Sequence, residues 1–163
     1  MSRRDWPAAV ERVATALRDA RVEARVEEFS TPTPTAQEAA DAVGCELGQI
    51  VKSLVFECDG RPVLVMVPGD RRADPAKIAA ATGSLRARVA GPAQVARATG
   101  FETGGVAPFP LARIDTVLIE QSLLTHELVW VGAGSRRHMA VLASADLVRM
   151  TRARAVDAVA DNP

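Results

Sequence analysis

The strongest constraint on the fold is a pair of β-rich segments separated by a short turn signal. Residues 50–58 and 62–67 are mostly valine, isoleucine, leucine and other apolar residues, and Asp59-Gly60 lies between them. An Asp-Gly pair suits two-residue turns that need positive φ, and such turns join neighbouring antiparallel strands. The middle of the chain is therefore predicted to be a β-hairpin, to which the remaining elements must add.

Capping residues and hydrophobic periodicity predict short helices and further strands around this hairpin. Thr35-Ala36-Gln37-Glu38 is a capping box closed by Gly44, and Asp5 is a candidate cap of the first helix. Residues 30–34 contain two prolines and are predicted to be a surface loop. The chain is expected to be mixed α+β, with about six strands in a strongly curved sheet. The predicted helices are 7–17, 35–43, 74–82, 92–99 and 146–159, and the predicted additional strands are 21–29, 85–89, 116–120, 128–132 and 139–142.

Length and composition indicate one domain over residues 1–163, because domains commonly contain ~100–200 residues. The formal net charge is zero, which argues against non-specific coating of nucleic acid but allows a local basic patch. Met1-Ser2-Arg3-Arg4 leads into an amphipathic segment, and no apolar run approaches the ~20 residues that span a bilayer. Cys45 and Cys58 are too few for a disulfide framework or a zinc site. A cytoplasmic protein without membrane contact, metal or cofactor is expected.

Lys52 stands out because the chain contains two lysines among its 20 basic residues. It lies in an apolar run, where alternation places it on the face of Ile50 and Leu54, opposite Val51 and Ser53. A cation on such a face must be paired, reach solvent or line a pocket. Two interpretations are open: an edge-strand lysine that extends to water, or a functional cation at the floor of a polar cleft.

Two glycine-rich segments are candidate parts of a binding site. Gly104-Gly105 lies in a loop at 100–110, where backbone N–H groups can reach a ligand oxygen, or where the chain makes only a tight turn. Gly132-Ala133-Gly134 is predicted to be a turn after a strand, followed by a hydroxyl, two guanidinium groups and an imidazole. His126-Glu127 begins like a zincin motif, but Trp130 occupies the place of the second histidine.

Several separated motifs follow one another along the chain: Thr-Ala-x-Glu-Ala-Ala, Gln-Ile-Val-Lys-Ser-Leu-Val-Phe, Val-Pro-Gly-Asp, Gly-Gly-Val-x-Pro-Phe and a Gly-x-Gly segment before Ala-Asp-Leu. In this order they resemble the YbaK/EbsC family, which is similar to the editing insertion domain of bacterial prolyl-tRNA synthetases. The resemblance covers about residues 26–147. It implies a barrel-like sheet and a deacylase that hydrolyses the ester of a wrongly charged tRNA. The segment 135–139 departs from the Gly-Gly-Lys-Arg-Gly-Leu-Asp stretch of cysteinyl-directed members, so the amino acid is left open.

The resemblance and the residues together predict a site. Lys52 and His138 are expected to be catalytic, with the imidazole facing the same pocket as the ammonium. The alternative for His138 is that it caps the turn or lies in solvent. Either Lys52 and the N–H groups of Gly104-Gly105 stabilise the oxyanion, or Lys52 holds the terminal phosphate and ribose. Arg136 and Arg137 are expected to contact tRNA, or to be solvated surface charges. The expected substrate-binding residues are Ser53, Gly104, Gly105, Val106, Pro108, Gly134 and Ser135.

The expected function is trans-editing, with mischarged aminoacyl-tRNA of the tRNA-Pro type as the substrate. A prolyl-tRNA synthetase or an elongation factor is a further candidate partner. The alternative is a non-catalytic module that binds an aminoacyl or nucleotide ligand and docks to a synthetase or tRNA.

Overall fold

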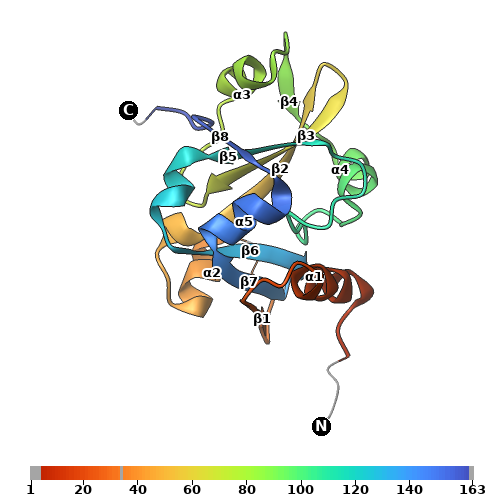
Figure 1. Ribbon diagram of the computed structural model, residues 1–163, viewed down its shortest axis with the longest axis vertical. Helices are drawn as coiled ribbons and strands as arrows, with labels where there is room; N and C mark the ends of the chain where they lie inside the picture. The colour runs from red at the N-terminus through yellow and green to blue at the C-terminus, as the bar shows by residue number, and fades with distance from the viewer. Residues whose placement is uncertain (1–4, 34, 162–163) are drawn as a thin grey trace.

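The structure is a computed structural model that describes residues 5–33 and 35–161 (Figure 1). The predictions made for residues 1–4 and for Pro34 lie outside this part of the chain. The elements are α1 (Ala8–Asp19), β1 (Ala24–Glu28), α2 (Ala36–Val43), η1 (Leu47–Gln49), β2 (Val51–Cys58), β3 (Arg61–Pro68), α3 (Pro75–Thr82), β4 (Ala87–Val89), α4 (Pro92–Thr99), β5 (Thr116–Glu120), η2 (Gln121–Thr125), β6 (Leu128–Ser135), β7 (His138–Ala143), α5 (Ser144–Thr151) and β8 (Arg154–Val156).

The strands form two sheets. The larger has the order β4-β2-β3-β5-β8, and the smaller has the order β1-β7-β6. A bridge between Ile50 and Trp130 joins them where the start of β2 meets β6. The mixed α+β class is confirmed, but the described strands number eight rather than about six, and neither sheet closes into a barrel. The barrel-like expectation is therefore not confirmed.

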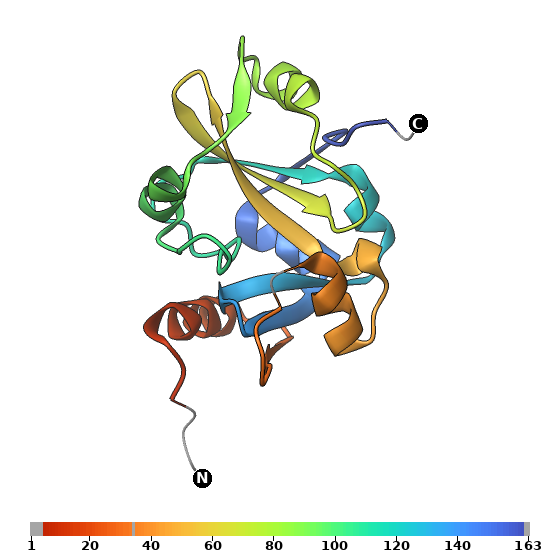
Figure 2. The ribbon, with the colours of Figure 1, turned by 180° about the vertical axis from the view of Figure 1, so that it is seen from behind.

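The predicted hairpin is confirmed, and β2 pairs with β3 along its whole length (Figure 2). Asp59 and Gly60 have φ values of 50° and 83°, as a two-residue turn of this type requires. Side chains of β3 alternate between two clusters: Val63, Val65 and Val67 pack with α3, while Leu64 and Met66 face the core between the two sheets. Both faces of the hairpin are covered, which fixes its register.

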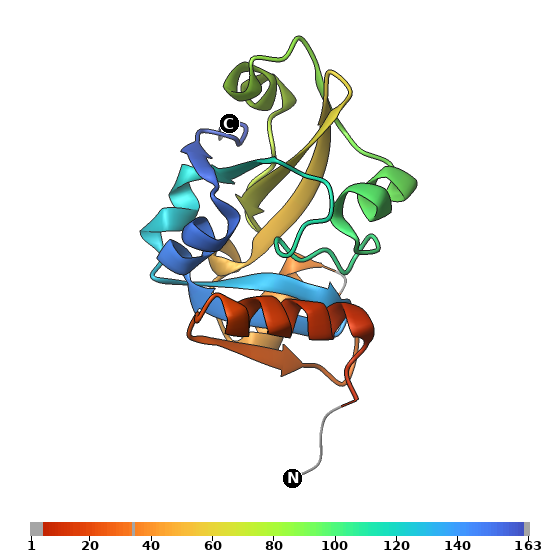
Figure 3. The same cartoon turned by 45° about the vertical axis from the view of Figure 1, so that its right-hand side comes forward.

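The smaller sheet packs against α1 on one face and α2 on the other (Figure 3). Val13 and Leu17 of α1 join the central cluster, while Trp130 and Met139 pack with two alanines of α2. The loop after α4 descends toward the far end of β6 (Figure 3). None of the described helices is long and apolar enough to cross a membrane.

Local capping signals predicted three helices well. Thr35 caps α2 by accepting a hydrogen bond from the Glu38 N–H, and Asp74 caps α3. Helix α4 spans the predicted range and ends at Gly100. Asp5 is not the cap of α1, because the helix begins after Pro7, where no side chain provides a cap.

Two predictions at the C-terminal side are wrong. The helix expected over 146–159 ends at Thr151, where Arg152 adopts a left-handed conformation, and β8 follows because it pairs with β5. Lys77 then holds the chain after β8, since its ammonium binds the Asp157 and Asp161 carboxylates and the Val159 carbonyl. Gly132–Gly134 is not a turn but part of β6, which carries a bulge before Ser135.

Candidate functional site

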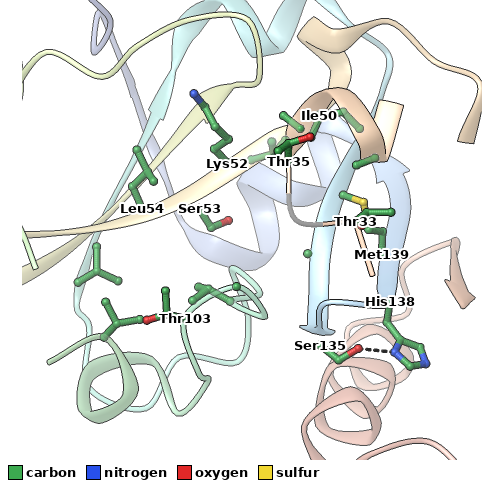
Figure 4. A pocket seen from close by; sticks show the side chains of 18 of the residues that line it. Thr33, Thr35, Ile50, Lys52, Ser53, Leu54, Thr103, Ser135, His138 and Met139 are labelled. Atoms are coloured by element: carbon green, nitrogen blue, oxygen red, sulfur yellow. Dashed lines mark hydrogen bonds between the residues drawn. The ribbon is translucent and has the colours of Figure 1, made fainter. Parts of the chain in front are cut away.

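The candidate site opens at the outer edge of β2. This edge meets Trp130 at Ile50, and it meets the β4 segment at Val55, whose carbonyl accepts the Ala90 N–H at 2.9 Å. Between these contacts the strands of the described chain pair with β2 only on the β3 side, and a cavity of about 380 Å³ borders the other side (Figure 4). A sheet edge of this kind presents backbone groups to whatever occupies the cavity.

Four separate parts of the chain form the remaining walls. Thr33 and the start of α2 provide one wall, the segment from β4 into α4 provides the second, the loop after α4 provides the third, and the β6–β7 pair provides the fourth. Their members include Thr35, Thr103, Val106, Ser135 and Met139. The lining is largely apolar with several hydroxyls, as expected for a site that holds a small organic group.

Ser53 lies at the centre of the open edge, and its hydroxyl points into the cavity (Figure 4). The Ser53 oxygen is buried and makes no hydrogen bond to any atom of residues 5–33 and 35–161. A buried hydroxyl without a partner is costly, so its position at the cavity wall points to a ligand group that completes it.

Lys52 projects from the opposite side of β2 (Figure 4). Its ammonium donates a hydrogen bond of 2.8 Å to the carbonyl of Arg71. Burial lowers the pKa of Lys52, while the nearby Asp70 carboxylate offsets part of that decrease and Arg72 adds to it. Lys52 borders the cavity, but its ammonium and the Ser53 hydroxyl lie on opposite sides of β2 and are not neighbours.

His138 is held away from the cavity. The Ser135 hydroxyl lies 2.5 Å from Nδ1 of the imidazole, and Trp6 packs edge-on against the ring at a centroid distance of 5.8 Å. Glu28 Oε2 is 3.1 Å from Nε2, close enough for electrostatic attraction although the two are not aligned for a hydrogen bond. Burial lowers the pKa of His138, and the Glu28 carboxylate acts in the opposite direction.

The expectation that this imidazole faces the same pocket as Lys52 is wrong. His138 belongs to the cavity wall, but its ring points away from the cavity (Figure 4). The reason is strand alternation: Met139, the next residue of β7, takes the cavity face, so the His138 ring takes the opposite face, where Trp6 packs against it.

The loop after α4 approaches β6 through glycine backbones. A Cβ atom on Gly132 would lie 2.4 Å from the Val106 carbonyl oxygen, and one on Gly105 would lie 3.0 Å from the Gly134 carbonyl oxygen. Gly104 has a φ of 90°. Gly132 allows an approach that no side chain would permit, and Gly105 leaves little room for one, so these residues set where the Val106 wall stands.

The structure separates the residues predicted in this loop. Gly104 and Val106 line the cavity, whereas Pro108 is buried and is not among the lining residues. The Gly105 N–H is already donated to the Glu102 carbonyl at 2.9 Å, so it is not a free donor for an oxyanion.

A second cavity of about 460 Å³ lies behind the contact between this loop and β6. It shares Thr103 and Ser135 with the first cavity and also includes Gly105 and Gly134. Arg12 and Arg136 belong to its walls. Arg137 is exposed in the β6–β7 turn, and its backbone N–H donates to the Ser135 hydroxyl oxygen.

Sequence patterns alone missed Glu28, Thr103 and Met139. Glu28 was recognisable as a polar residue at the end of a strand, but its approach to His138 depends on the antiparallel register of β1 and β7, which are far apart in sequence. Met139 follows from strand alternation once the start of β7 is known. No sequence motif or periodicity indicates that Thr103, in the loop after α4, lines the cavity.

The molecule is thus a mixed α+β domain with a cleft that borders an open edge of β2. The family profile described as "Aminoacyl-tRNA editing domain" matches residues 30–150. The chain therefore belongs to the family of aminoacyl-tRNA editing domains. The predicted resemblance to YbaK/EbsC proteins and prolyl-tRNA synthetase editing domains is confirmed. One of the similar proteins, from Enterococcus faecalis, carries the name EbsC.

Three similar proteins illustrate the range of the family. The protein YwhH of Bacillus subtilis (strain 168) is 38% identical over 112 residues, which cover 68% of this chain and 71% of YwhH. A proline–tRNA ligase of Maridesulfovibrio salexigens is 32% identical over 112 residues, but these make up 19% of that ligase. A crystal structure described as a candidate trans-editing enzyme for prolyl tRNA synthetase superposes with a TM-score of 0.89 at 33% identity, covering 96% of this chain and 100% of the other.

Proposed function

We propose that this protein hydrolyses, in trans, the ester bond of mischarged aminoacyl-tRNA, with tRNA of the prolyl type as the expected carrier. The observation that carries the proposal is the unpartnered Ser53 hydroxyl in an open cavity of about 380 Å³, in a chain of the editing family. A cavity of this size suits an amino acid with part of a ribose, not a large ligand.

In the proposed reaction a water oxygen bonds to the ester carbonyl carbon, and the bond from that carbon to the ribose oxygen breaks. The ribose oxygen takes up a proton, which gives the free tRNA terminus and the amino acid. Donors fixed around the carbonyl oxygen stabilise the negative charge that develops there. Because aminoacyl esters are reactive, positioning of the ester and the water supplies much of the remaining acceleration.

Lys52 is proposed to bind the terminal phosphate and ribose rather than the carbonyl oxygen. Its ammonium lies around the strand edge from Ser53, and Arg71 and Arg72 stand close to it. A compact ammonium with three donors suits a phosphate at the rim of a narrow cleft. His138 is proposed to be a positioning residue, because it contacts the Ser135 hydroxyl and its own ring is turned away from the cavity.

The test is a deacylation panel with alanyl-, cysteinyl-, seryl- and threonyl-tRNA-Pro, with prolyl-tRNA-Pro as the correctly charged control. Each rate is divided by the rate of spontaneous hydrolysis in buffer. The proposal expects at least one mischarged member to be hydrolysed and the prolyl ester to be spared. If the protein binds these tRNAs but accelerates none of the hydrolyses, the alternative of a non-catalytic binding module is correct.

A further inference from the structure

The direction of the backbone groups of Ser53 follows from the hairpin. Cys58 and Arg61 flank the two-residue turn, and the pair that flanks such a turn exchanges hydrogen bonds. Because hydrogen-bonded positions alternate along an antiparallel pair, the backbone N–H and carbonyl groups of Lys52 and Leu54 are directed toward β3. Ser53 is therefore directed the other way, with its N–H and its carbonyl both facing the open edge.

An independent contact supports this assignment. The Val55 carbonyl, two residues from Ser53, accepts the Ala90 N–H on the outer edge. Beyond Ala90 the chain turns away from β2, since Gly91 caps helix α4. The next hydrogen-bonding position along this edge is Ser53, where the cavity lies instead of a strand. The N–H, the carbonyl and the unpartnered hydroxyl of one residue thus face the same space.

We propose that the substrate's aminoacyl group pairs with Ser53 as if it were one residue of an antiparallel strand, an inference that rests on the proposed function. An aminoacyl ester carries an α-ammonium donor and a carbonyl acceptor on one Cα, as a strand residue does. The ammonium donates to the Ser53 carbonyl, and the ester carbonyl accepts from the Ser53 N–H. The same N–H then stabilises the oxyanion as water adds to the carbonyl carbon.

Antiparallel pairing also fixes the direction of the substrate. Its amino end points along β2 toward Val55, and its ester oxygen points toward Val51. At Val55 the edge is already occupied by Ala90. An acyl group on the α-nitrogen would collide with the Ala90–Gly91 backbone, so the site accepts esters with a free α-amino group and excludes N-acylated, peptidyl-type esters.

The ligand test uses 3′-deoxy-3′-(L-alanylamino)adenosine, its N-acetyl derivative and the propionyl derivative that lacks the amine. Titration calorimetry on the full chain measures each affinity. Loss of a charged hydrogen bond predicts that both altered compounds bind ~10-fold or more weakly than the alanyl compound. Equal affinities for the alanyl and N-acetyl compounds, or no binding of the alanyl compound, overturn the proposal.

Protein variants test the backbone group separately from the hydroxyl. Ser53→Pro removes the N–H that faces the cavity without removing a bond to β3, whereas Leu54→Pro removes a bond to β3 and should unfold the hairpin. A folded Ser53→Pro that binds the alanyl compound ~10-fold more weakly, with a smaller loss in Ser53→Ala, supports the assignment. Unchanged binding by folded Ser53→Pro contradicts it; if this variant unfolds, the ligand series decides.

Hydrolysis distinguishes this inference from the proposed function. Alanyl-tRNA and N-acetylalanyl-tRNA are compared, each relative to its own rate in buffer. If both are hydrolysed with equal acceleration, the deacylase proposal stands and the Ser53 pairing is wrong. If none of the aminoacyl-tRNAs is hydrolysed, the deacylase proposal fails. Weaker binding of the N-acetyl compound than of the alanyl compound would still support the pairing with Ser53.

Discussion

The hydroxyl oxygen of Ser135 lies 2.5 Å from Nδ1 of His138, so the buried imidazole fixes the orientation of a hydroxyl at the wall of the cavity. The same oxygen accepts the Arg137 N–H at 3.0 Å. The Ser135 hydroxyl is thereby held by two contacts, one to the imidazole and one to the Arg137 backbone. The Ser53 hydroxyl, by contrast, is buried and makes no hydrogen bond within residues 5–33 and 35–161.

His138→Ala should lower kcat on the best substrate of the panel by ~10-fold while the protein stays folded, because Ser135 loses its orientation. Ser135→Ala should cause a similar decrease, and the double variant should be no slower than either single variant, since the two residues act as a unit. His126→Ala is the matched control, because His126 lies in a separate small cavity with Asp70 and should retain normal turnover. Additive effects of the two substitutions would show that the residues act independently.

Stability should decrease as the pH falls below neutrality. Burial lowers the pKa of His138 in the folded state, so below the unfolded pKa of ~6.5 the unfolded chain binds a proton that the folded chain does not. The stabilisation from neutral His138 is complete above that pH and is lost progressively below it. Denaturant unfolding at several pH values should show this slope, and His138→Gln should reduce it. An unchanged slope in the variant would assign the effect to other groups.

Lys52→Ala should reduce deacylation by ~10²-fold or more with little loss of stability, as expected for loss of a key charge. Lys52→Arg should restore little, because a planar guanidinium replaces a compact ammonium. The other lysine is the control: Lys77→Ala releases the segment around Asp157 and Asp161, so it should lower the melting temperature and leave turnover normal. Near-normal turnover by Lys52→Ala would refute the role proposed for this residue.

Gly104→Ala should change the relative rates across the tRNA panel rather than unfold the domain. An added Cβ would lie 2.6 Å from Nε of Arg136, whose flexible side chain can move, and the loop would shift with it. Positive φ at this position costs alanine ~1–2 kcal/mol. Gly83→Ala carries a comparable backbone cost at a φ of 66° with open space around it, so it should lower stability without altering selectivity. Constant rate ratios in Gly104→Ala would exclude the loop from selectivity.

Arg136→Gln should weaken tRNA binding and reduce its dependence on salt. If Arg136 neutralises one phosphate, the slope of log affinity against log salt should fall by ~0.7–0.9. Arg149→Gln is the control, because Arg149 pairs with Asp146 on α5 and borders neither of the two larger cavities. Equal slopes for the wild type and Arg136→Gln would place this guanidinium outside the interface.

Local signals predicted much of the fold. The Asp59-Gly60 turn, the Thr35 cap and the Asp74-Pro75 helix start are each determined by residues a few positions apart, and each is confirmed. The helix prediction for residues 152–159 is wrong for the opposite reason, because distant residues determine the structure there. The helical pattern of this segment is overridden by pairing of β8 with β5 and by the ion pairs of Lys77, which join residues some 80 positions apart in sequence.

The candidate site was only partly predictable for the same physical reason. The sequence marks Lys52 and Ser53 as neighbours on a strand with opposite faces, as the structure has them. It does not reveal which edge of that strand is open, because this depends on where β6 and β4 touch it. The direction of the His138 ring depends likewise on the exact start of β7.

The short open edge of β2 also bears on the risk of self-association. An unpaired strand edge is a place where a second molecule can add a strand and begin an aggregate. Here Trp130 occupies one end and Ala90 the other, and the stretch between them is too short to pair with a strand of ordinary length. This stretch of β2 thus stays open without offering neighbouring molecules a template. Substitutions that loosen β4 from β2 should therefore promote aggregation before they affect the hairpin itself.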